Sequence, residues 1–288
     1  MSASGRRRTR SQAPCMMLSM ALLRMPELAS AASAVAIEPV SGGGQIGVVH
    51  QPFPQTFSAR VTDATGAPVP GVSVAFEVDR CNSSPEVHSC PPPSVYPFFE
   101  GPVASVGVQT DASGVATTPP LTAGSGTGYF QIFATIDAPE LDFAHAYFPL
   151  RQVESLPTVA IGPGFTGAWY DPTQSGHGIL LEVLPQDRLL AYWFAFTPDG
   201  DQQAWFGGVG TIIGNQAIIY ADRGRGGRWI PSFDPAAFAL DSWGTLTFTF
   251  SDCSHGRVYF YGAGNSSPWG GGSMDLTRLT QPAGLSCP

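Results

Sequence analysis

Apolar and polar residues alternate along several short segments of the chain, which is the pattern of β-strands with one buried face. In the first half the alternation is clearest in Thr56–Asp63, Val72–Asp79 and Tyr129–Ile136. The apolar positions, which we expect to face a core, are Phe57, Ala59, Val61, Val72, Val74, Phe76, Val78, Phe130, Ile132, Ala134 and Ile136. About seven short strands between residues 36 and 150 predict a β-sandwich.

Turn sequences separate these strands. Thr65–Gly71 reads TGAPVPG and Asp111–Gly114 reads DASG, and both combine residues that favour tight turns. We expect Asp63 and Asp111 to shape these turns, because an Asp side chain can accept a hydrogen bond from the backbone two residues further on.

The second half, residues 164–288, contains about eight further strand patterns with hairpin signals between them. The expected strands are Phe165–Tyr170, Gly178–Leu184, Leu189–Phe196, Gln203–Thr211, Gln216–Tyr220, Thr245–Ser251, Arg257–Tyr261 and Gly272–Leu279. Ala221–Gly244 is predicted to be a long loop. An antiparallel domain of this kind is either a small barrel or a sandwich, and eight strands can close around side chains or one small ligand.

All six Trp lie beyond residues 151–163, a Pro-containing stretch that we interpret as a linker between two domains. Aromatic faces stack on sugar rings and on other apolar ligands, whereas a buried Trp fills a core. The Arg-rich stretch from Asp222 to Trp229 is either an anion-binding loop or a solvated one. Together these features give the candidate ligand-binding residues Trp169, Tyr170, His177, Trp193, Trp205, Arg225, Arg228 and Trp229.

Composition and charge favour an exported protein. The chain has 288 residues, 12% of them charged, and its basic residues are all Arg. Residues 1–34 resemble a signal peptide, with the basic run Arg6–Arg8, the apolar stretch Met16–Leu23 and an A-x-A site at Ala32–Ala34. The net charge of −8 argues against nucleic acid as a partner. No later stretch predicts a transmembrane helix in the mature chain.

Four cysteines follow the predicted leader. Because export favours disulfides, we expect pairing within each half, Cys81 with Cys90 and Cys253 with Cys287, among three arithmetically allowed connectivities. Zinc is the alternative, but neither CxxC spacing nor a His cluster supports it. We therefore expect no metal and no cofactor.

The sequence contains no convincing catalytic motif. Ser175 lacks the G-x-S-x-G setting of a nucleophile elbow, and a triad of Ser175, His177 and Asp171 would have to form within one turn. Glu182 is the only Glu of the second half, so a carboxylate pair for glycoside hydrolysis would need Asp partners. No catalytic residue is assigned.

The first half resembles a known family. The run FSARVTDATGAPVPGVSVAFEV, followed by VQTDASGVATTPPLTAGSGTGYFQIFA, is similar to bacterial Ig-like domains of the Big-1 type found in intimin and invasin-like surface proteins. The resemblance covers residues 36–150, except for the Pro-rich insertion Arg80–Gly101. It implies an Ig-like β-sandwich that acts as a rigid spacer or adhesive module and has no catalytic residues.

The second half opens with GAWYDPTQSGHG at Gly167–Gly178, which resembles a G-x-W-Y-x-P-x-x-S-G-x-G signature of exported proteobacterial proteins of uncharacterised function. A looser likeness to lipocalins and avidins rests on the early G-x-W alone. The expected fold is thus all-β, an Ig-like sandwich followed by a second antiparallel β-domain.

These observations predict a secreted, surface or periplasmic protein without enzymatic activity. Its Ig-like half would space or adhere, and its Trp-rich half would bind a ligand or partner, with a glycan as the expected class. Two alternatives remain open: a secreted hydrolase of an extracellular polymer, and a purely structural protein whose Trp all serve the core.

Overall fold

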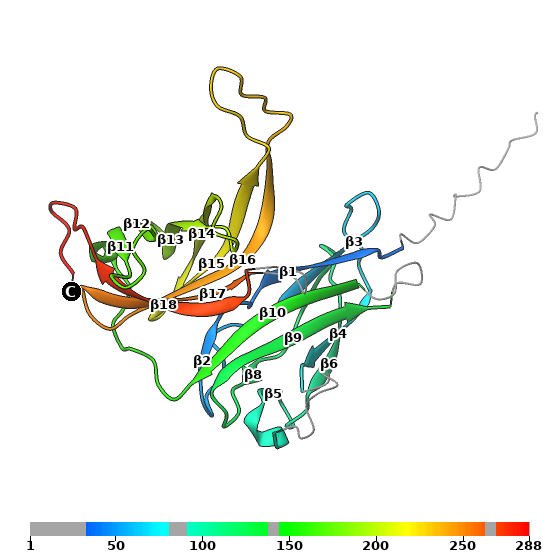
Figure 1. Cartoon of the computed structure of the whole chain (residues 1–288). Coiled ribbons are helices and arrows are strands. Elements are labelled where there is room, and N and C mark those ends of the chain that lie inside the picture. The colour runs from blue at the N-terminus through cyan, green and yellow to red at the C-terminus, as the bar shows by residue number, and fades with distance from the viewer. Residues whose placement is uncertain (1–32, 81–90, 138–143, 263–268, 288) are drawn as a thin grey trace, which may run out of the picture. The chain divides into compact units, whose positions relative to one another are not determined.

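The computed structural model describes residues 33–80, 91–137, 144–262 and 269–287, and these residues form an all-β protein (Figure 1). The predicted fold class is confirmed. The strands belong to a three-stranded sheet, a five-stranded sheet, a short two-stranded sheet and a closed barrel. The predicted Cys81–Cys90 pair and residues 1–32 of the predicted leader lie outside the described residues.

The first half forms two main sheets. The three-stranded sheet has the order β1-β3-β7, and the five-stranded sheet has the order β2-β10-β9-β4-β6. The smallest sheet pairs β5 with β8. The strands are β1 (Ala36–Ser41), β2 (Ile46–Val48), β3 (Ser58–Thr62), β4 (Ser73–Val78), β5 (Phe98–Phe99), β6 (Ser105–Gln109), β7 (Val115–Thr117), β8 (Leu121–Thr122), β9 (Gly128–Ile136) and β10 (Ala144–Val153).

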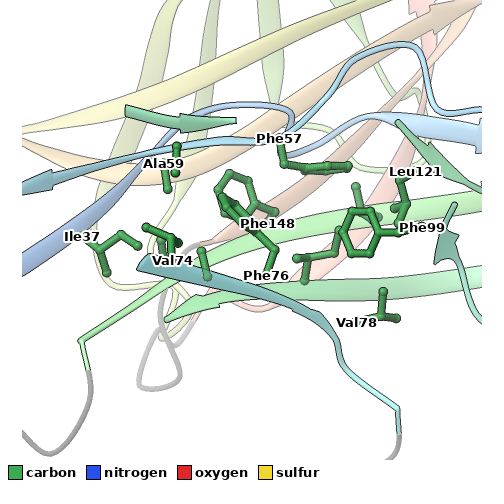
Figure 2. Close-up of a cluster of buried hydrophobic side chains, with 14 of the residues drawn as sticks. Ile37, Phe57, Ala59, Val74, Phe76, Val78, Phe99, Leu121 and Phe148 are labelled. Atoms are coloured by element: carbon green, nitrogen blue, oxygen red, sulfur yellow. The ribbon is translucent and has the colours of Figure 1, made fainter. Parts of the chain in front are cut away.

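Both main sheets contribute to one hydrophobic core, in a sandwich-like arrangement (Figure 2). Phe57, next to β3 of the smaller sheet, packs edge-on against Phe148 of β10, with ring centroids 5.6 Å apart. Phe76 of β4 packs against the same Phe148 at 6.0 Å. The alternation in the sequence therefore identified the buried faces of β3, β4 and β9 correctly. The narrower Ig-like assignment stays a prediction.

The two Asp turns form as expected. Asp63 Oδ1 accepts hydrogen bonds from the backbone N–H groups of Thr65 and Ala67, at 2.8 and 2.9 Å. Asp111 Oδ1 repeats this arrangement with Ser113 and Val115, at 2.8 and 3.0 Å. Hydrogen bonds to the charged form, first from the hydroxyl of the residue two positions on, lower the pKa of both carboxyl groups.

The second half is a closed barrel in which consecutive strands are antiparallel neighbours and the last strand pairs with the first. This resolves the choice between barrel and sandwich. The eight strands are β11 (Gly167–Tyr170), β12 (Gly178–Leu184), β13 (Arg188–Phe196), β14 (Gln203–Ile213), β15 (Gln216–Arg225), β16 (Ala239–Phe250), β17 (His255–Gly262) and β18 (Gly271–Arg278).

The predicted loop Ala221–Gly244 is too long at both ends. β15 continues to Arg225 and β16 begins at Ala239, so the hairpin extends past the barrel wall, and residues 226–238 form the loop at its tip (Figure 1). A bulge at Ala221/Asp222 marks where the extension begins. Most side chains in this extension are exposed, so the sequence has no alternation there to indicate strands.

Residues 32–288 belong to one compact unit, and a buried amide joins the barrel to the first half within it. Gln216 of β15 accepts a hydrogen bond from the Ile46 N–H at 2.9 Å and donates to the Ile46 carbonyl at 2.7 Å. No helix within the described ranges has the length and apolar character that crossing a membrane requires.

Candidate ligand-binding site

One end of the barrel is filled by aromatic side chains. Phe165, in the 3-10 turn η2 (Pro163–Phe165), packs against Phe250 at the end of β16 with ring centroids 4.5 Å apart. Trp169 of β11 lies 5.0 Å from Phe250, and its Nε1 donates a hydrogen bond to the Phe165 carbonyl at 3.1 Å. This filled end is therefore a packed core with a satisfied indole.

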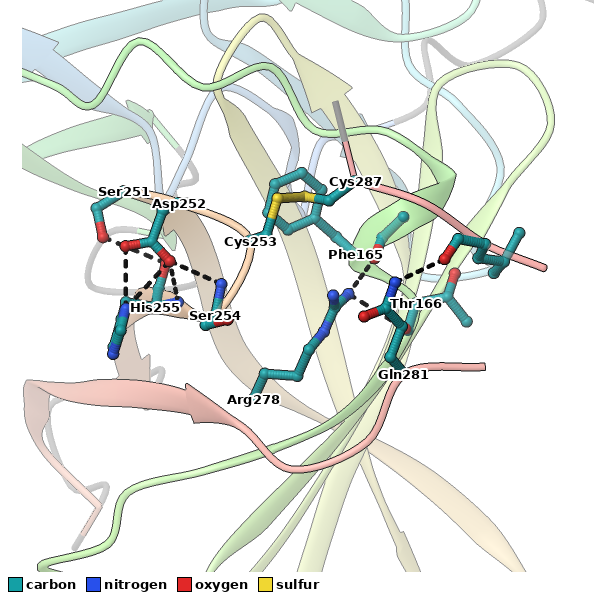
Figure 3. The surroundings of a disulfide bond; sticks show 12 residues. Phe165, Thr166, Ser251, Asp252, Cys253, Ser254, His255, Arg278, Gln281 and Cys287 are labelled. Carbon is teal, nitrogen blue, oxygen red and sulfur yellow. Dashed lines mark hydrogen bonds and ion pairs between the residues drawn. A yellow bond between two sulfur atoms is a disulfide. The ribbon is translucent and has the colours of Figure 1, made fainter. Parts of the chain in front are cut away.

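Arg278 and a disulfide complete the filled end (Figure 3). The Arg278 guanidinium lies 5.0 Å from the centre of the Trp169 ring, within the range of a cation–π contact. Its Nη2 donates to the Gly164 carbonyl, and burial lowers the pKa of this guanidinium. Cys253 and Cys287 form a disulfide bond, so the predicted pairing of the second half is confirmed.

The other end of the barrel contains a cavity of about 220 Å³. Its lining comes from the turn between β11 and β12, the beginnings of β14 and β18, the ends of β13 and β17, and the first half of β16. Because neighbouring strands are antiparallel, these segments all meet at one end. Along β16, Trp243 of the cavity and Phe250 of the filled end are separated by about 23 Å of strand.

Three indoles and three phenyl rings make up half of the residues that line the cavity. Trp193 of β13 and Trp243 of β16 lie with ring centroids 6.0 Å apart and nearly perpendicular planes, at 87°. Phe206 of β14 stacks on Trp243 at 4.3 Å and meets Trp269 edge-on at 4.9 Å. The wall thus presents aromatic faces and edges from four different strands or their flanking turns.

Three buried nitrogen atoms of cavity-lining residues have no hydrogen-bond partner among the described residues. They are Trp193 Nε1, Trp243 Nε1 and His177 Nδ1. Trp193 and Trp243 are 6% and 5% exposed. No acidic side chain of the described residues lines the cavity, so it has no carboxylate pair of the kind that glycoside hydrolysis uses.

A buried carboxylate organises the turn that leads to His177. Asp171, 5% exposed, accepts hydrogen bonds from the Thr173 N–H and hydroxyl at 2.8 and 2.7 Å, and from Gln174 Nε2 at 2.8 Å. These bonds, led by the Thr173 hydroxyl, lower the pKa of the Asp171 carboxyl. The turn places Gln174 and His177 on the cavity wall, while the Asp171 oxygens are taken by its own neighbours.

Only His177 and Trp193 of the eight candidate residues line the cavity. Trp169 is buried at the filled end, and Tyr170 is half-buried at the end of β11. Trp205 is 45% exposed on the outer face of β14, beside Tyr192 at 5.9 Å.

The Arg-rich candidates lie on the extended hairpin. Arg225 Nε donates to Asp241 Oδ1 at 2.9 Å, and this ion pair is exposed. Arg228 and Trp229 belong to the exposed tip, where Trp229 is 86% exposed. The structure therefore places His177 and Trp193 at the cavity, Trp169 in the packed end and Tyr170 half-buried, and it exposes the remaining candidates on the barrel exterior and the hairpin.

The sequence did not single out Trp243, Trp269, Phe206 or Phe260 as cavity residues. A signal for one of them was present: Ala204 and Phe206 alternate with Trp205, so the apolar face of β14 could have been assigned to the interior. Trp269 comes just before β18, outside any alternation, and nothing in the sequence places it.

Neither a protein-family model nor a curated protein matches the sequence. Within the described parts of the chain, no group of three or more His, Cys, Asp or Glu could hold a metal ion. The geometry of the cavity is therefore the observation on which a functional argument rests.

Proposed function

We propose that the protein is an exported, non-enzymatic binding protein whose barrel holds a small ligand in the aromatic cavity. The observation that carries this proposal is the cavity of about 220 Å³ walled by Trp193, Trp243 and Trp269. Small-molecule sites are concave and mostly apolar, with a few polar groups that fix orientation, and this cavity has that composition.

The barrel architecture supports the proposal. An eight-stranded barrel leaves an interior that side chains can fill or that can hold one small ligand. Here Phe165, Trp169 and Phe250 fill one end, and the cavity occupies the other. Rings of sugars or other compact molecules can stack on the indole faces, so a glycan remains the first class to test.

In this proposal the first half acts as a spacer or adhesion module, in line with its resemblance to Big-1 domains. Its core is built from both main sheets, and the Gln216 amide ties it to the barrel. Such a joint would hold the cavity at a fixed position on a surface-attached or secreted protein.

Tryptophan fluorescence tests the proposal. The purified chain is titrated with soluble glycans and with compact ring compounds, and a saturable change in emission is expected for at least one class. The change should be smaller in Trp193→Phe, because one of the three cavity indoles is lost, and should persist in full in Trp205→Phe, a matched control on the outer face. A flat response to the whole panel would contradict the proposal.

A further inference from the structure

The outer face of the barrel carries a row of exposed apolar side chains. Tyr192 of β13 and Trp205 of β14 lie with ring centroids 5.9 Å apart. Trp205 is the register partner of Phe194, and Leu180 of β12 is the register partner of Tyr192. Val209 lies four residues beyond Trp205 on the same face of β14. All five side chains are exposed, so this part of the barrel wall is apolar toward solvent.

The row continues onto the extended hairpin. A Cβ atom at Gly224 of β15 would lie 3.2 Å from the Phe238 ring and 3.4 Å from the Trp205 ring. Leu240 of β16 is the register partner of Gly224 and lies on the same face. Phe238 packs against Phe233 of the tip, with ring centroids 6.4 Å apart. We call this surface the aromatic strip, and it consists of Leu180, Tyr192, Phe194, Trp205, Val209, Trp229, Ile230, Phe233, Phe238 and Leu240.

The hairpin extension has one apolar face and one charged face. Arg223, Arg225 and Asp241 lie on the charged face, because they alternate along their strands with the residues of the apolar face. Among the described residues, neither β14 nor β17 pairs with this part of the hairpin. A two-stranded ribbon is only marginally stable in water, so its apolar face gains stability when a partner covers it.

The size of the aromatic strip fits a protein partner. Its residues expose roughly 1,000 Å², since a large aromatic side chain offers about 150–250 Å². The largest apolar patch of a typical monomer measures about 300–600 Å². A stable interface buries about 800 Å² on each partner. The strip is therefore larger than a monomer ordinarily exposes, and it is large enough for one side of a stable dimer.

Charge favours a second copy of the chain as that partner. The whole sequence has a net charge of −8, so two copies repel each other in general. Residues 222–241 of the hairpin instead contain three Arg and three Asp and are neutral. Two copies that meet here bring no excess of like charge together. Apolar contacts are not directional, so the strip can pack against its own copy across a twofold axis.

We propose that the aromatic strip is the interface of a homodimer in which the strips of two copies face each other. Trp205, Phe238 and Leu240 lie at its centre, because they join the barrel wall to the hairpin. The interface uses none of the three indoles that line the cavity, so this inference goes beyond the proposed function and does not depend on it.

Sedimentation equilibrium of the purified chain tests the proposal. We expect a mass of twice that of one chain at micromolar concentrations and dissociation on dilution. Amide hydrogen exchange of the unaltered chain gives a second readout that needs no variant. Exchange in residues 222–241 should slow as the protein concentration rises, because the partner covers the hairpin.

Variants locate the interface. Leu240→Asp and Val209→Asp place a charge in the strip, and each should raise the dissociation constant of the dimer at least tenfold. Val103→Asp is the matched control, because Val103 of the first half is 45% exposed and Val209 is 48% exposed. It should leave the dissociation constant unchanged. Circular dichroism confirms that each variant is folded.

Three results would overturn the inference. A chain that stays monomeric throughout the micromolar range has no such dimer. If that monomer also sediments with phosphatidylcholine vesicles, the strip contacts a lipid surface instead of a second copy. A dimer whose dissociation constant is unchanged in both strip variants has its interface elsewhere. Ligand binding in the cavity can persist in each of these cases, so the proposed function is tested separately.

Discussion

The two ends of the barrel use the same residue types for different purposes. At the filled end, Trp169 is packed against Phe165 and Phe250, and its N–H is bonded to a backbone carbonyl. At the cavity end, Trp193 and Trp243 are also buried, but their N–H groups have no partner among the described residues. The two ends therefore differ in how their indole N–H groups are satisfied and in whether an open cavity lies beside the rings.

The largest difference between the ends should appear in stability. Phe250→Ala removes a fully buried ring from the filled end and should lower the free energy of unfolding by about 3–5 kcal/mol. Phe260→Ala removes the same side chain from the cavity wall, where the ring is half-buried, and should cost clearly less. Urea unfolding of both variants measures the difference, and equal losses would mean that the two ends are packed alike.

Loss of the disulfide should lower the stability of the protein without changing ligand binding at the cavity end. Replacing Cys253 and Cys287 by Ser removes a bond that spans 34 residues, and the loss should be about 2–4 kcal/mol. Ligand binding at the opposite end should stay unchanged once the variant is folded. Thermal unfolding and the fluorescence titration provide the two readouts, and a loss of binding in the folded variant would show that the ends are coupled.

Asp171 links stability to pH at the cavity end. Its carboxyl has a lowered pKa in the folded protein, so its stabilisation is present above the ordinary pKa of an Asp and is lost as the pH falls through the folded value. Asp171→Asn should therefore lower the free energy of unfolding by about 1–3 kcal/mol at neutral pH.

Below the folded pKa of Asp171, the stabilities of the variant and the original protein should converge. Unfolding by urea at a series of pH values from neutral to strongly acidic measures this. Asp199→Asn changes a carboxyl with a lowered pKa on an exposed hairpin turn, and it should have a smaller effect. A constant gap between Asp171→Asn and the original protein at all pH values would contradict the assignment.

The smallest effect is expected on the extended hairpin. Arg225 and Asp241 form an exposed ion pair, and exposed pairs contribute little because water and salt screen them. Arg225→Gln should leave both the urea midpoint and ligand binding unchanged. A marked drop in ligand affinity would instead place the hairpin in the binding site.

Much of this fold was predictable because its strands each have one face in a core. β12 has the predicted bounds Gly178–Leu184, and Phe57 and Phe76 are buried as the alternation indicated. A strand that has no face in a core shows no alternation of apolar and polar residues, so the sequence does not reveal it. The outer part of the β15–β16 hairpin is held by backbone hydrogen bonds between mostly exposed residues. From the sequence, this part was predicted to be a loop.

The cavity was less predictable than the strands. The sequence showed that the second half is rich in Trp, and Trp193 and His177 were among the candidates. Which indoles share one end depends on how far each strand is staggered against its neighbours around a closed barrel. That stagger places Trp243 near Trp193 and Trp169 near Phe250, and no local pattern encodes it.

The paired hydrogen bonds between Gln216 and Ile46 have a consequence for solubility. β2 is an edge strand of its sheet, and an open strand edge is a template on which other chains can add and aggregate. The Gln216 amide occupies both the N–H and the carbonyl of Ile46, as a neighbouring strand would. At Ile46, a side chain from the barrel thus occupies the strand edge to which another chain could otherwise add.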